Sequence, residues 1–354
     1  MGMRPRAALA SVAVAIAVAA LVAVLGAVAG CSKKAPVPSG PSPELTGLAA
    51  VPSSADVIVG LDVGRLAESP IVTRAIEMLL VREPELASRW QALRDSCKLE
   101  LGQVNRLMIA LGPPAPGGRF GTGPMVMIAT GKVSEADLVK CVRDIVGKGG
   151  GSLVVKDQGG RTLYQVKDGA RTMFIAFGRT DTVILGSSEA YVLEAVGVGK
   201  KALDNPELGG WLKLADQNAP VWVVGRVAER LKASLIRVSN NTLKAGARAY
   251  IGSIDLTSGV EAELVALMES PEDAKQLELL VNGNLVGLSW AAQVAALAKV
   301  VQKITIKAQG ASVRFTVPLS MDDVNRVLSA LDGGGAAAQD SPPQGGSASP
   351  PPAP

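Results

Sequence analysis

The sequence contains no histidine among its 354 residues. Imidazole is the commonest general base and a frequent zinc ligand, so its absence excludes Ser-His-Asp catalysis, Cys-His catalysis and imidazole metal sites. The nucleophile patterns G-x-S-x-G and S-x-x-K do not occur, and neither do the two glycine-rich phosphate-binding patterns. Chemistry by carboxylates, lysine or tyrosine stays open. We nevertheless expect a protein that is not an enzyme and that holds no cofactor and no metal.

Aromatic residues make up only 3% of the chain, and neither sign of charge dominates. Pockets for apolar ligands are usually lined by aromatic side chains, so the sequence has little material for a large one. The 36 basic residues are nearly balanced by 32 acidic residues. Nucleic-acid binding needs concentrated positive charge, and no basic stretch interleaved with aromatics occurs. We therefore expect no nucleic-acid partner.

The N-terminus carries the most specific pattern in the chain. Arg4 and Arg6 precede an uncharged run over residues 7–30. The run ends in the sequence Val28-Ala29-Gly30-Cys31. An aliphatic residue, two small residues and a cysteine in this order resemble the end of a bacterial lipoprotein signal peptide. The resemblance implies that residues 1–30 are a signal peptide that is removed, and that lipid on Cys31 attaches the chain to a membrane.

The same run has a second interpretation. About 20 apolar residues suffice to cross a bilayer, so an uncleaved transmembrane anchor is the alternative to a lipoprotein signal. Because the positive residues precede the run, both alternatives place the rest of the chain outside the cytoplasm, in the cell envelope. Ser32 follows the cysteine, and the lipoprotein resemblance then implies the outer membrane, facing the periplasm, rather than the inner membrane.

Composition divides the rest of the chain into four segments. Residues 31–44 are rich in proline and serine, and because proline removes hydrogen-bond donors we expect an extended tether there. Residues 332–354 are rich in Gly, Ala, Ser and Pro, and we expect them to be disordered. Between these segments we expect two folded halves, residues 45–205 and residues 206–331.

Turn and cap signals in the two halves predict an α+β protein. Asp168-Gly169 lies between two strand-like runs and is typical of a tight hairpin turn. A serine followed three residues later by an acid predicts the capped start of a helix. The pairs are Ser134 with Asp137, Ser270 with Asp273, and Ser320 with Asp323. We expect antiparallel hairpins with amphipathic helices packed on one face of the sheet.

The same order of signals occurs in both halves. Each half opens with an apolar strand and a G-x-x-x-x-R-L stretch, Gly60–Leu66 in the first half and Gly225–Leu231 in the second. A hairpin, a capped helix, further strands and a last helix follow in each half. We interpret this order as an internal duplication, with independent use of common hairpin signals as the alternative.

Cys97 and Cys141 are the two cysteines that remain once Cys31 carries lipid. An oxidising exterior permits a disulfide between them. Cys141 lies on the apolar stripe of an expected helix, and this position also fits a buried free thiol. Two cysteines without histidine make a poor metal site.

Two acidic pairs are the remaining candidates for chemistry. Glu261 and Glu263 occupy alternate positions of an expected strand, and Asp322 and Asp323 lie at an expected helix start. Solvation and favourable contact with a helix N-terminus explain such positions, so we assign no catalytic residue.

The stretch Val51–Val59, which continues to Asp62 and Leu66, resembles the opening of uncharacterised extracytoplasmic bacterial families. That resemblance carries no active site. The predicted function is therefore that of a non-catalytic envelope lipoprotein that binds an envelope protein or a cell-wall partner. The alternative is a carrier for a lipid or another apolar ligand between the sheet and its helices. The side chains expected in that cleft are Leu264, Leu267, Leu277 and Leu280.

Overall fold

The computed structural model describes residues 47–327, apart from 98–100, 119, 159, 198 and 292–299. The predictions made for the signal peptide (1–30), for Cys31, for the tether (31–44) and for the tail (332–354) all fall outside the described residues.

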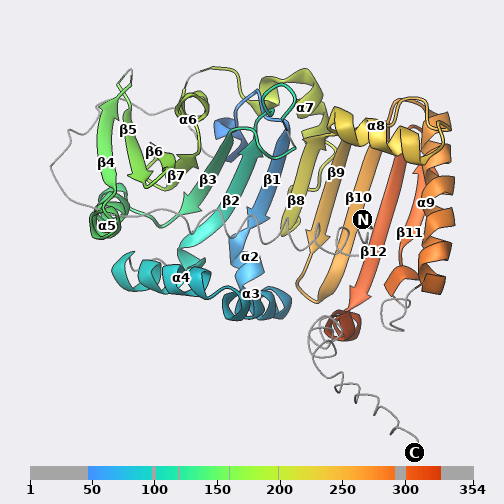
Figure 1. Cartoon of the computed structure of the whole chain (residues 1–354), viewed down its shortest axis with the longest axis horizontal. Coiled ribbons are helices and arrows are strands. Elements are labelled where there is room, and N and C mark those ends of the chain that lie inside the picture. The colour runs from blue at the N-terminus through green and yellow to red at the C-terminus, as the bar shows by residue number, and fades with distance from the viewer. Residues whose placement is uncertain are drawn as a thin grey trace, which may run out of the picture.

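The described residues form one antiparallel sheet of twelve strands (Figure 1). In chain order these are β1 (Val57–Asp62), β2 (Val104–Leu111), β3 (Met125–Gly131), β4 (Ser152–Asp157), β5 (Thr162–Asp168), β6 (Arg171–Arg179), β7 (Thr182–Gly186), β8 (Val221–Arg226), β9 (Ala247–Asp255), β10 (Gly259–Met268), β11 (Thr305–Gln309) and β12 (Ser312–Ser320). Their order across the sheet is β11-β12-β10-β9-β8-β1-β2-β3-β7-β6-β5-β4. The pair β1/β8 is therefore near the centre.

Helices lie along both ends of the strands and beside the sheet. They are η2 (Gly47–Ala50), α2 (Val63–Ala67), α3 (Pro70–Arg82), α4 (Pro84–Cys97), η3 (Leu101–Gln103), α5 (Glu135–Lys148), α6 (Glu189–Val196), η4 (Ala202–Asp204), α7 (Pro206–Leu212), α8 (Glu229–Val238), α9 (Pro271–Ala291) and a helical segment at 321–327. Figure 1 shows α6, α7 and α8 along one end of the strands, and α3 and α4 along the other. None of the helices in the described part of the chain is long and apolar enough to cross a membrane.

The local signals in the sequence are confirmed. Gly169 connects β5 to β6 with a φ of 55°, a backbone conformation that glycine adopts without a steric penalty. The hydroxyl oxygens of Ser134, Ser270 and Ser320 each accept the backbone N–H three residues later, at 3.2, 3.1 and 3.3 Å. The α+β class and the antiparallel hairpins are thus as predicted.

The helices, however, cover both faces of the sheet. Phe174 and Ala176 of β6 belong to the core cluster that contains Tyr191 of α6, whereas Ile175 between them belongs to the cluster that contains Val142 of α5. Because side chains alternate between the faces of a strand, α6 and α5 lie on opposite faces. We call these the α6 face and the α5 face. The expectation of helices on one face is corrected here, because strands that are apolar on both sides need cover on both.

Helix α9 lies on the same face as α5. Ile251 of β9 belongs to the α6-face cluster, whereas its neighbour Tyr250 packs against the cluster formed by α9 and the last strands. The α5 face is therefore covered by α5 over the outer strands of the first half and by α9 over those of the second.

Strand order repeats about the central pair. Outward from β1 come β2, β3 and then β7, which is the last strand of the first half. Outward from β8 come β9, β10 and then β12, which is the last strand of the second half. Helices α5 and α9 follow the corresponding strands β3 and β10. The two halves share this topology within one continuous sheet, and the expected boundary at 205/206 falls between η4 and α7.

Two glycines near the centre of the sheet make room for aromatic rings on the neighbouring strands. A Cβ atom on Gly60 would lie 2.1 Å from Cε2 of Trp222, its partner across β1/β8. A Cβ atom on Gly225 would lie 2.5 Å from the Tyr250 ring, its partner across β8/β9. Trp222 is buried. Close passage of a ring over a strand is one of the few reasons that require glycine inside a strand.

We predict that Gly60→Ala lowers the free energy of unfolding by about 2 kcal/mol, because the added methyl group forces the Trp222 ring out of its position. Urea denaturation followed by tryptophan fluorescence measures the change. Gly283→Ala is the matched control, since a Cβ atom there meets no heavy atom within 4 Å on the exposed side of α9. That variant should be neutral or more stable by up to about 1 kcal/mol. Equal effects of the two substitutions would contradict the packing argument.

Candidate functional site

The α6 face is covered over the first half of the sheet and bears polar side chains over the second. Val265 of β10 lies opposite Ile251 of the α6-face core, so Glu263 and Glu261, two and four residues earlier, point to the same face. The residues opposite the two glutamates are Asp255 and Ser253 on β9, and Pro318 and Thr316 on β12, and all of them except Pro318 are polar. We call this surface the open polar face, and it consists of Ser253, Asp255, Glu261, Glu263, Arg314 and Thr316.

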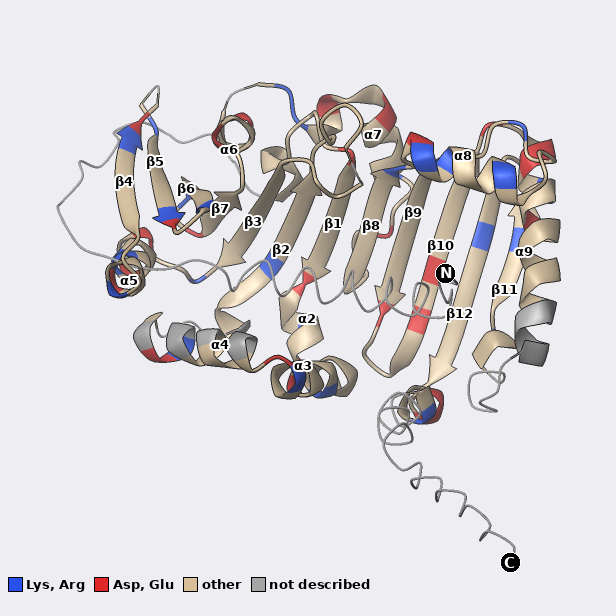
Figure 2. Cartoon of the chain, in the orientation of Figure 1, with Lys and Arg blue, Asp and Glu red and all other residues tan. Residues whose placement is uncertain are grey.

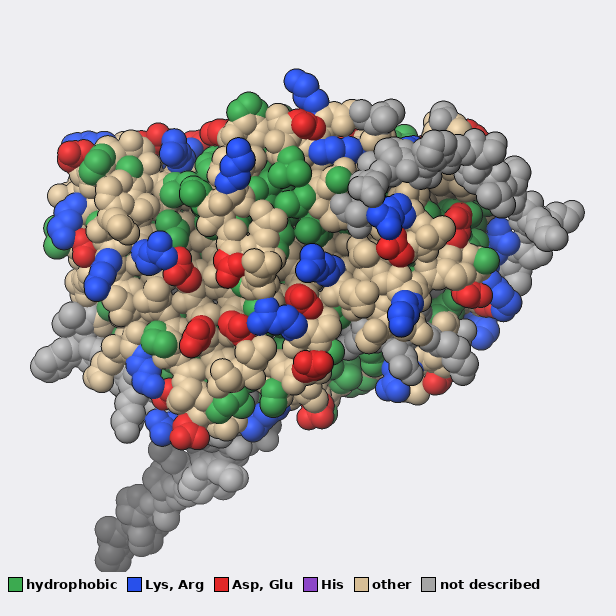
Figure 3. Space-filling model, turned by 180° about the vertical axis from the view of Figure 1, so that it is seen from behind, with side chains coloured by type: hydrophobic (Ala, Val, Ile, Leu, Met, Phe, Trp, Pro, Cys, Tyr) green, Lys and Arg blue, Asp and Glu red, His purple; other side chains and the backbone are tan. Residues whose placement is uncertain are grey.

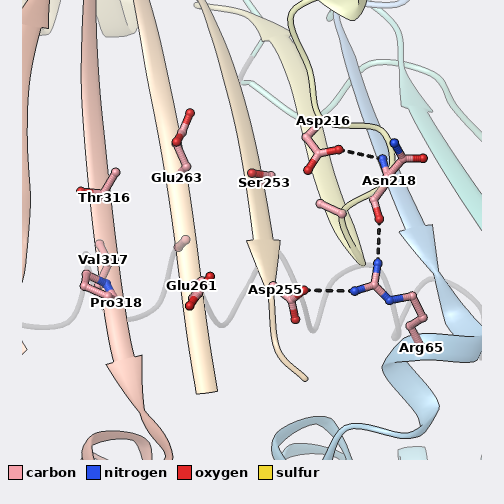
Figure 4. A pocket seen from close by; sticks show the side chains of 12 residues that line it. Arg65, Asp216, Asn218, Ser253, Asp255, Glu261, Glu263, Thr316, Val317 and Pro318 are labelled. Atoms are coloured by element: carbon pink, nitrogen blue, oxygen red, sulfur yellow. Dashed lines mark hydrogen bonds and ion pairs between the residues drawn. The ribbon is translucent and has the colours of Figure 1, made fainter. Parts of the chain in front are cut away.

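A pocket of about 430 Å³ lies where the open polar face meets the loop after α7. Its lining residues are Arg65, Asp216, Asn218, Ala219, Ser253, Asp255, Glu261, Ala262, Glu263, Thr316, Val317 and Pro318. Figure 4 shows the carboxylates of β9 and β10 beside the loop that carries Asp216. Figure 3, the view from behind, shows acidic and basic side chains interspersed over this side of the molecule. Four carboxylates and a single arginine line the pocket, so its lining is acidic.

Arg65 connects three elements at this pocket. The Asp62 side chain accepts the Arg65 N–H at 3.1 Å and so caps α2, which holds the arginine at the end of β1. Its guanidinium donates to the carbonyl oxygen of Asn218 at 2.7 Å and to Oδ2 of Asp255 at 3.1 Å. Figure 4 shows both contacts as dashed lines. The arginine of the first half thereby fixes the loop and the strand that form one wall of the pocket.

Asp255 is held in its charged form. Thr257 donates its hydroxyl and its backbone N–H to Oδ1 of Asp255, at 2.6 and 2.8 Å. These hydrogen bonds, and after them the charge of Arg65, lower the pKa of the Asp255 carboxyl below its ordinary value. An ionised carboxylate can accept hydrogen bonds and attract cations, but it cannot donate a proton. Asp255 is therefore suited to recognition and not to general acid catalysis.

The two glutamates of β10 differ in their partners. Glu263 forms an ion pair with Arg314 across β10/β12. Glu261 is exposed, and its side chain makes no hydrogen bond or ion pair with any residue in the described part of the chain. No three acidic or cysteine side chains among the described residues are grouped so that they could hold a metal ion. The surface therefore offers one free carboxylate within a framework of fixed charges.

The structure joins Cys97 and Cys141 in a disulfide. Cys97 ends α4 and Cys141 lies in the middle of α5, and their Cα atoms are 5.1 Å apart. This separation is typical of disulfides. The bond fastens α4 to the helix that covers the α5 face, far from the open polar face in the order of the strands.

The four leucines expected for an apolar carrier are not brought together. Leu264 is exposed on the α5 face, whereas Leu267 packs against the core of the α6 face. Leu277 and Leu280 of α9 belong to the core beneath that helix. They are core and surface residues that line no common cleft.

Asp323 has a structural role. Its carboxylate accepts the backbone N–H and the hydroxyl of Ser320, at 2.9 and 2.6 Å, and it forms an ion pair with Lys303. These contacts, with Lys303 first, hold the pKa of Asp323 well below its usual range. The acid is one half of a cap at the start of the helical segment 321–327.

Sequence reasoning found Glu261 and Glu263 but missed Arg65, Asp216 and Asp255 as their neighbours. Arg65 is the arginine of the repeated G-x-x-x-x-R-L stretch, and that repetition was the signal that could have singled it out. Its partner Asp255 is 190 residues away, and no local pattern connects two such positions.

We predict that Thr257→Val raises the pKa of Asp255 more than Arg65→Met does, because the Thr257 hydroxyl is the stronger influence. Carboxyl-carbon NMR titration measures both shifts, and Thr316→Val in the same pocket is the control. A depressed folded-state pKa contributes stability that is complete above the unfolded-state pKa and is lost as the pH falls through the folded-state value. A larger rise in Arg65→Met would show that the ion pair dominates.

We also predict that replacing Cys97 and Cys141 by serine lowers the free energy of unfolding. The two residues are separated by 44 positions, for which loss of loop closure in the unfolded chain corresponds to about 4 kcal/mol. Denaturation of the oxidised and reduced parent beside the double variant measures this loss. If reduction of the parent leaves its stability unchanged, the bond does not form in the native protein.

The sequence matches no protein-family model and no curated protein. Among solved structures, the chain is similar to one described as crystal form I of TP0453, with a TM-score of 0.39 and a sequence identity of 10%. The alignment covers 81% of this chain and 96% of that chain. A similarity of this size identifies neither an activity nor a ligand.

Proposed function

We propose that this chain is a non-catalytic lipoprotein of the bacterial cell envelope that binds an envelope protein or cell-wall partner through the open polar face. The observation that carries the binding role is that half of one sheet face bears polar side chains where the other half is packed under helices. The lipobox at Val28–Cys31 supports the anchor. We place the protein at the outer membrane, facing the periplasm.

The chemistry of the open polar face suits recognition. Charged residues of both signs lie on neighbouring strands, and the diagonal ion pair of Glu263 with Arg314 fixes the positions of these two side chains. Preformed charges of this kind select a partner by electrostatic complementarity. The unpartnered Glu261 and the ionised Asp255 would accept hydrogen bonds from lysine, arginine or amide groups of that partner.

The absence of histidine and the ion-paired state of Asp255 and Glu263 support a role without catalysis. Glu261→Gln tests this part of the proposal directly. We expect the parent and the variant to show no hydrolysis of peptidoglycan, peptide or glycoside substrates. A hydrolytic activity that the parent has and Glu261→Gln lacks would establish an enzyme instead.

Photo-crosslinking in cells tests the binding surface. We predict that a photoreactive amino acid at Thr316 on the open polar face yields a discrete crosslinked species, and that the added substitution Glu261→Lys removes it. Leu279 is the control position, because it is exposed on α9 at the other face. Crosslinks of equal yield and size from both positions, or crosslinks insensitive to Glu261→Lys, would contradict the assignment.

Metabolic labelling with an alkyne fatty acid tests the anchor. We predict that the chain incorporates the label, that it loses residues 1–30 by intact mass, and that Cys31→Ala abolishes both changes. Retention of residues 1–30 in the membrane-bound parent would favour the uncleaved transmembrane anchor.

A further inference from the structure

Helix α8 exposes apolar side chains. Leu231 is 53% exposed and Val238 is 67% exposed, and they are seven residues apart, so they lie on one side of the helix. Leu235 and Ile236 on the adjoining side pack against the core of the second half. The apolar stripe of α8 therefore extends beyond its contact with the protein.

The surroundings of this stripe are strongly basic. Residues 228–248 contain five basic side chains and one acidic side chain. The basic residues are Arg230, Lys232, Arg237, Lys244 and Arg248. The acid, Glu229, already pairs with Lys232 at 2.7 Å. Figure 2 shows the basic residues recurring along α8 and the loop that follows it.

Of these five basic side chains, Lys232 alone forms an ion pair with an acid in the described part of the chain. Asp273 at the start of α9 is buried and accepts the backbone N–H groups of Lys244 and Ala245, at 2.7 and 3.1 Å. The side chains of Arg237 and Arg248 make no ion pair or hydrogen bond with the residues that the structure describes. Exposed leucine and valine flanked by free cations form the pattern of a helix that lies in a membrane interface.

Helix α8 lies at the end of the sheet where the chain coming from Cys31 enters β1, and this position is compatible with contact between α8 and a membrane. Val57 at the start of β1 pairs with Gly225 near the end of β8, and the Arg226 N–H donates to the Asp56 carbonyl at 2.8 Å. Helix α8 follows β8 directly, so it starts at the end of the sheet where the chain enters β1 (Figure 1). Fifteen residues lie between Cys31 and Gly47, a stretch that reaches about 50 Å when extended. An anchor on Cys31 would therefore allow this end of the sheet to reach the bilayer.

We propose that α8 docks on the anionic phospholipid surface of the membrane that holds the anchor, with Leu231 and Val238 in the interface and the surrounding cations on the headgroups. This inference rests on the proposed lipid anchor. It adds a second, reversible contact that sets the orientation of the domain.

The test uses the processed, lipidated protein in vesicles. Cys31 is then blocked by lipid and Cys97 is bonded to Cys141, so an introduced cysteine is the single free thiol. An environment-sensitive fluorophore is attached to Val238→Cys, or to the matched control Val81→Cys, which is 81% exposed on α3 at the opposite end of the strands. The vesicles consist of phosphatidylcholine alone or of phosphatidylcholine with phosphatidylglycerol.

The expected result is a blue shift at position 238 with phosphatidylglycerol, no shift with phosphatidylcholine alone, and no shift at position 81. Adding Arg237→Gln, Lys244→Gln and Arg248→Gln should lower the ratio of docked to undocked protein roughly a hundredfold, because three headgroup-facing cations are lost. No shift at position 238, a shift that ignores lipid charge, or a shift that survives the triple substitution overturns the docking proposal. Failure of the anchor is separately visible, because the parent protein without an added cysteine would then react with the fluorophore at Cys31.

Discussion

The pairing of β1 with β8 is the contact on which the rest of the structure depends. It is the one place where the sheet of the first half meets that of the second, and its ladder continues beyond both strands through the N–H groups of Arg226 and Asp62, each 2.8 Å from its acceptor. The Trp222 ring lies across Gly60 at this joint, so the two strands are matched by shape as well as by hydrogen bonds. Without the joint, each half would expose a long apolar edge strand, which is a hazard for aggregation.

The shared topology extends outward from this joint, but the helical segments that follow the last strand of each half pack in different places. In the first half the chain leaves β7 into α6, whose Tyr191, Val192 and Ala195 are buried against the sheet. In the second half the chain leaves β12 into the segment 321–327, where Asn325 accepts a hydrogen bond from Arg74 of α3 at the far end of the strands. No described helix covers the α6 face of the outer strands of the second half. The polar residues on those strands agree with this exposure, since alternating glutamates are unsuited to burial.

How much the sequence could predict depended on the range of each interaction. Caps and hairpin turns join residues three or four positions apart, so Ser134, Ser270 and Gly169 revealed them. Ser69 caps α3 in the same way, but the residue three positions later is Val72 and not an acid, so the pattern did not predict this helix. Contacts such as Arg65 with Asp255 have no local signal. The repeated G-x-x-x-x-R-L stretch aligned residues that are not structurally equivalent. Gly60 is two residues from Ile58 of the α6-face core and lies on the α6 face, whereas Gly225 is next to Val224 of the same core and lies on the α5 face. A shift of one residue along a strand exchanges the faces, so sequence frame and structural equivalence differ by one position.

The position of α8 on the sheet determines how the open polar face would be oriented relative to a membrane. Helix α8 lies along one end of the strands, so a membrane against α8 would meet the sheet end-on, with the strands directed away from the bilayer (Figure 1). Both faces of the sheet would then stand upright in the surrounding compartment, and the pocket around Asp255 and Glu261 would be open to the side, not pressed against lipid. A basic helix toward anionic headgroups would also keep the acidic lining of that pocket away from a surface that repels it. An orientation set by α8 is thus the one that leaves the open polar face accessible to a partner.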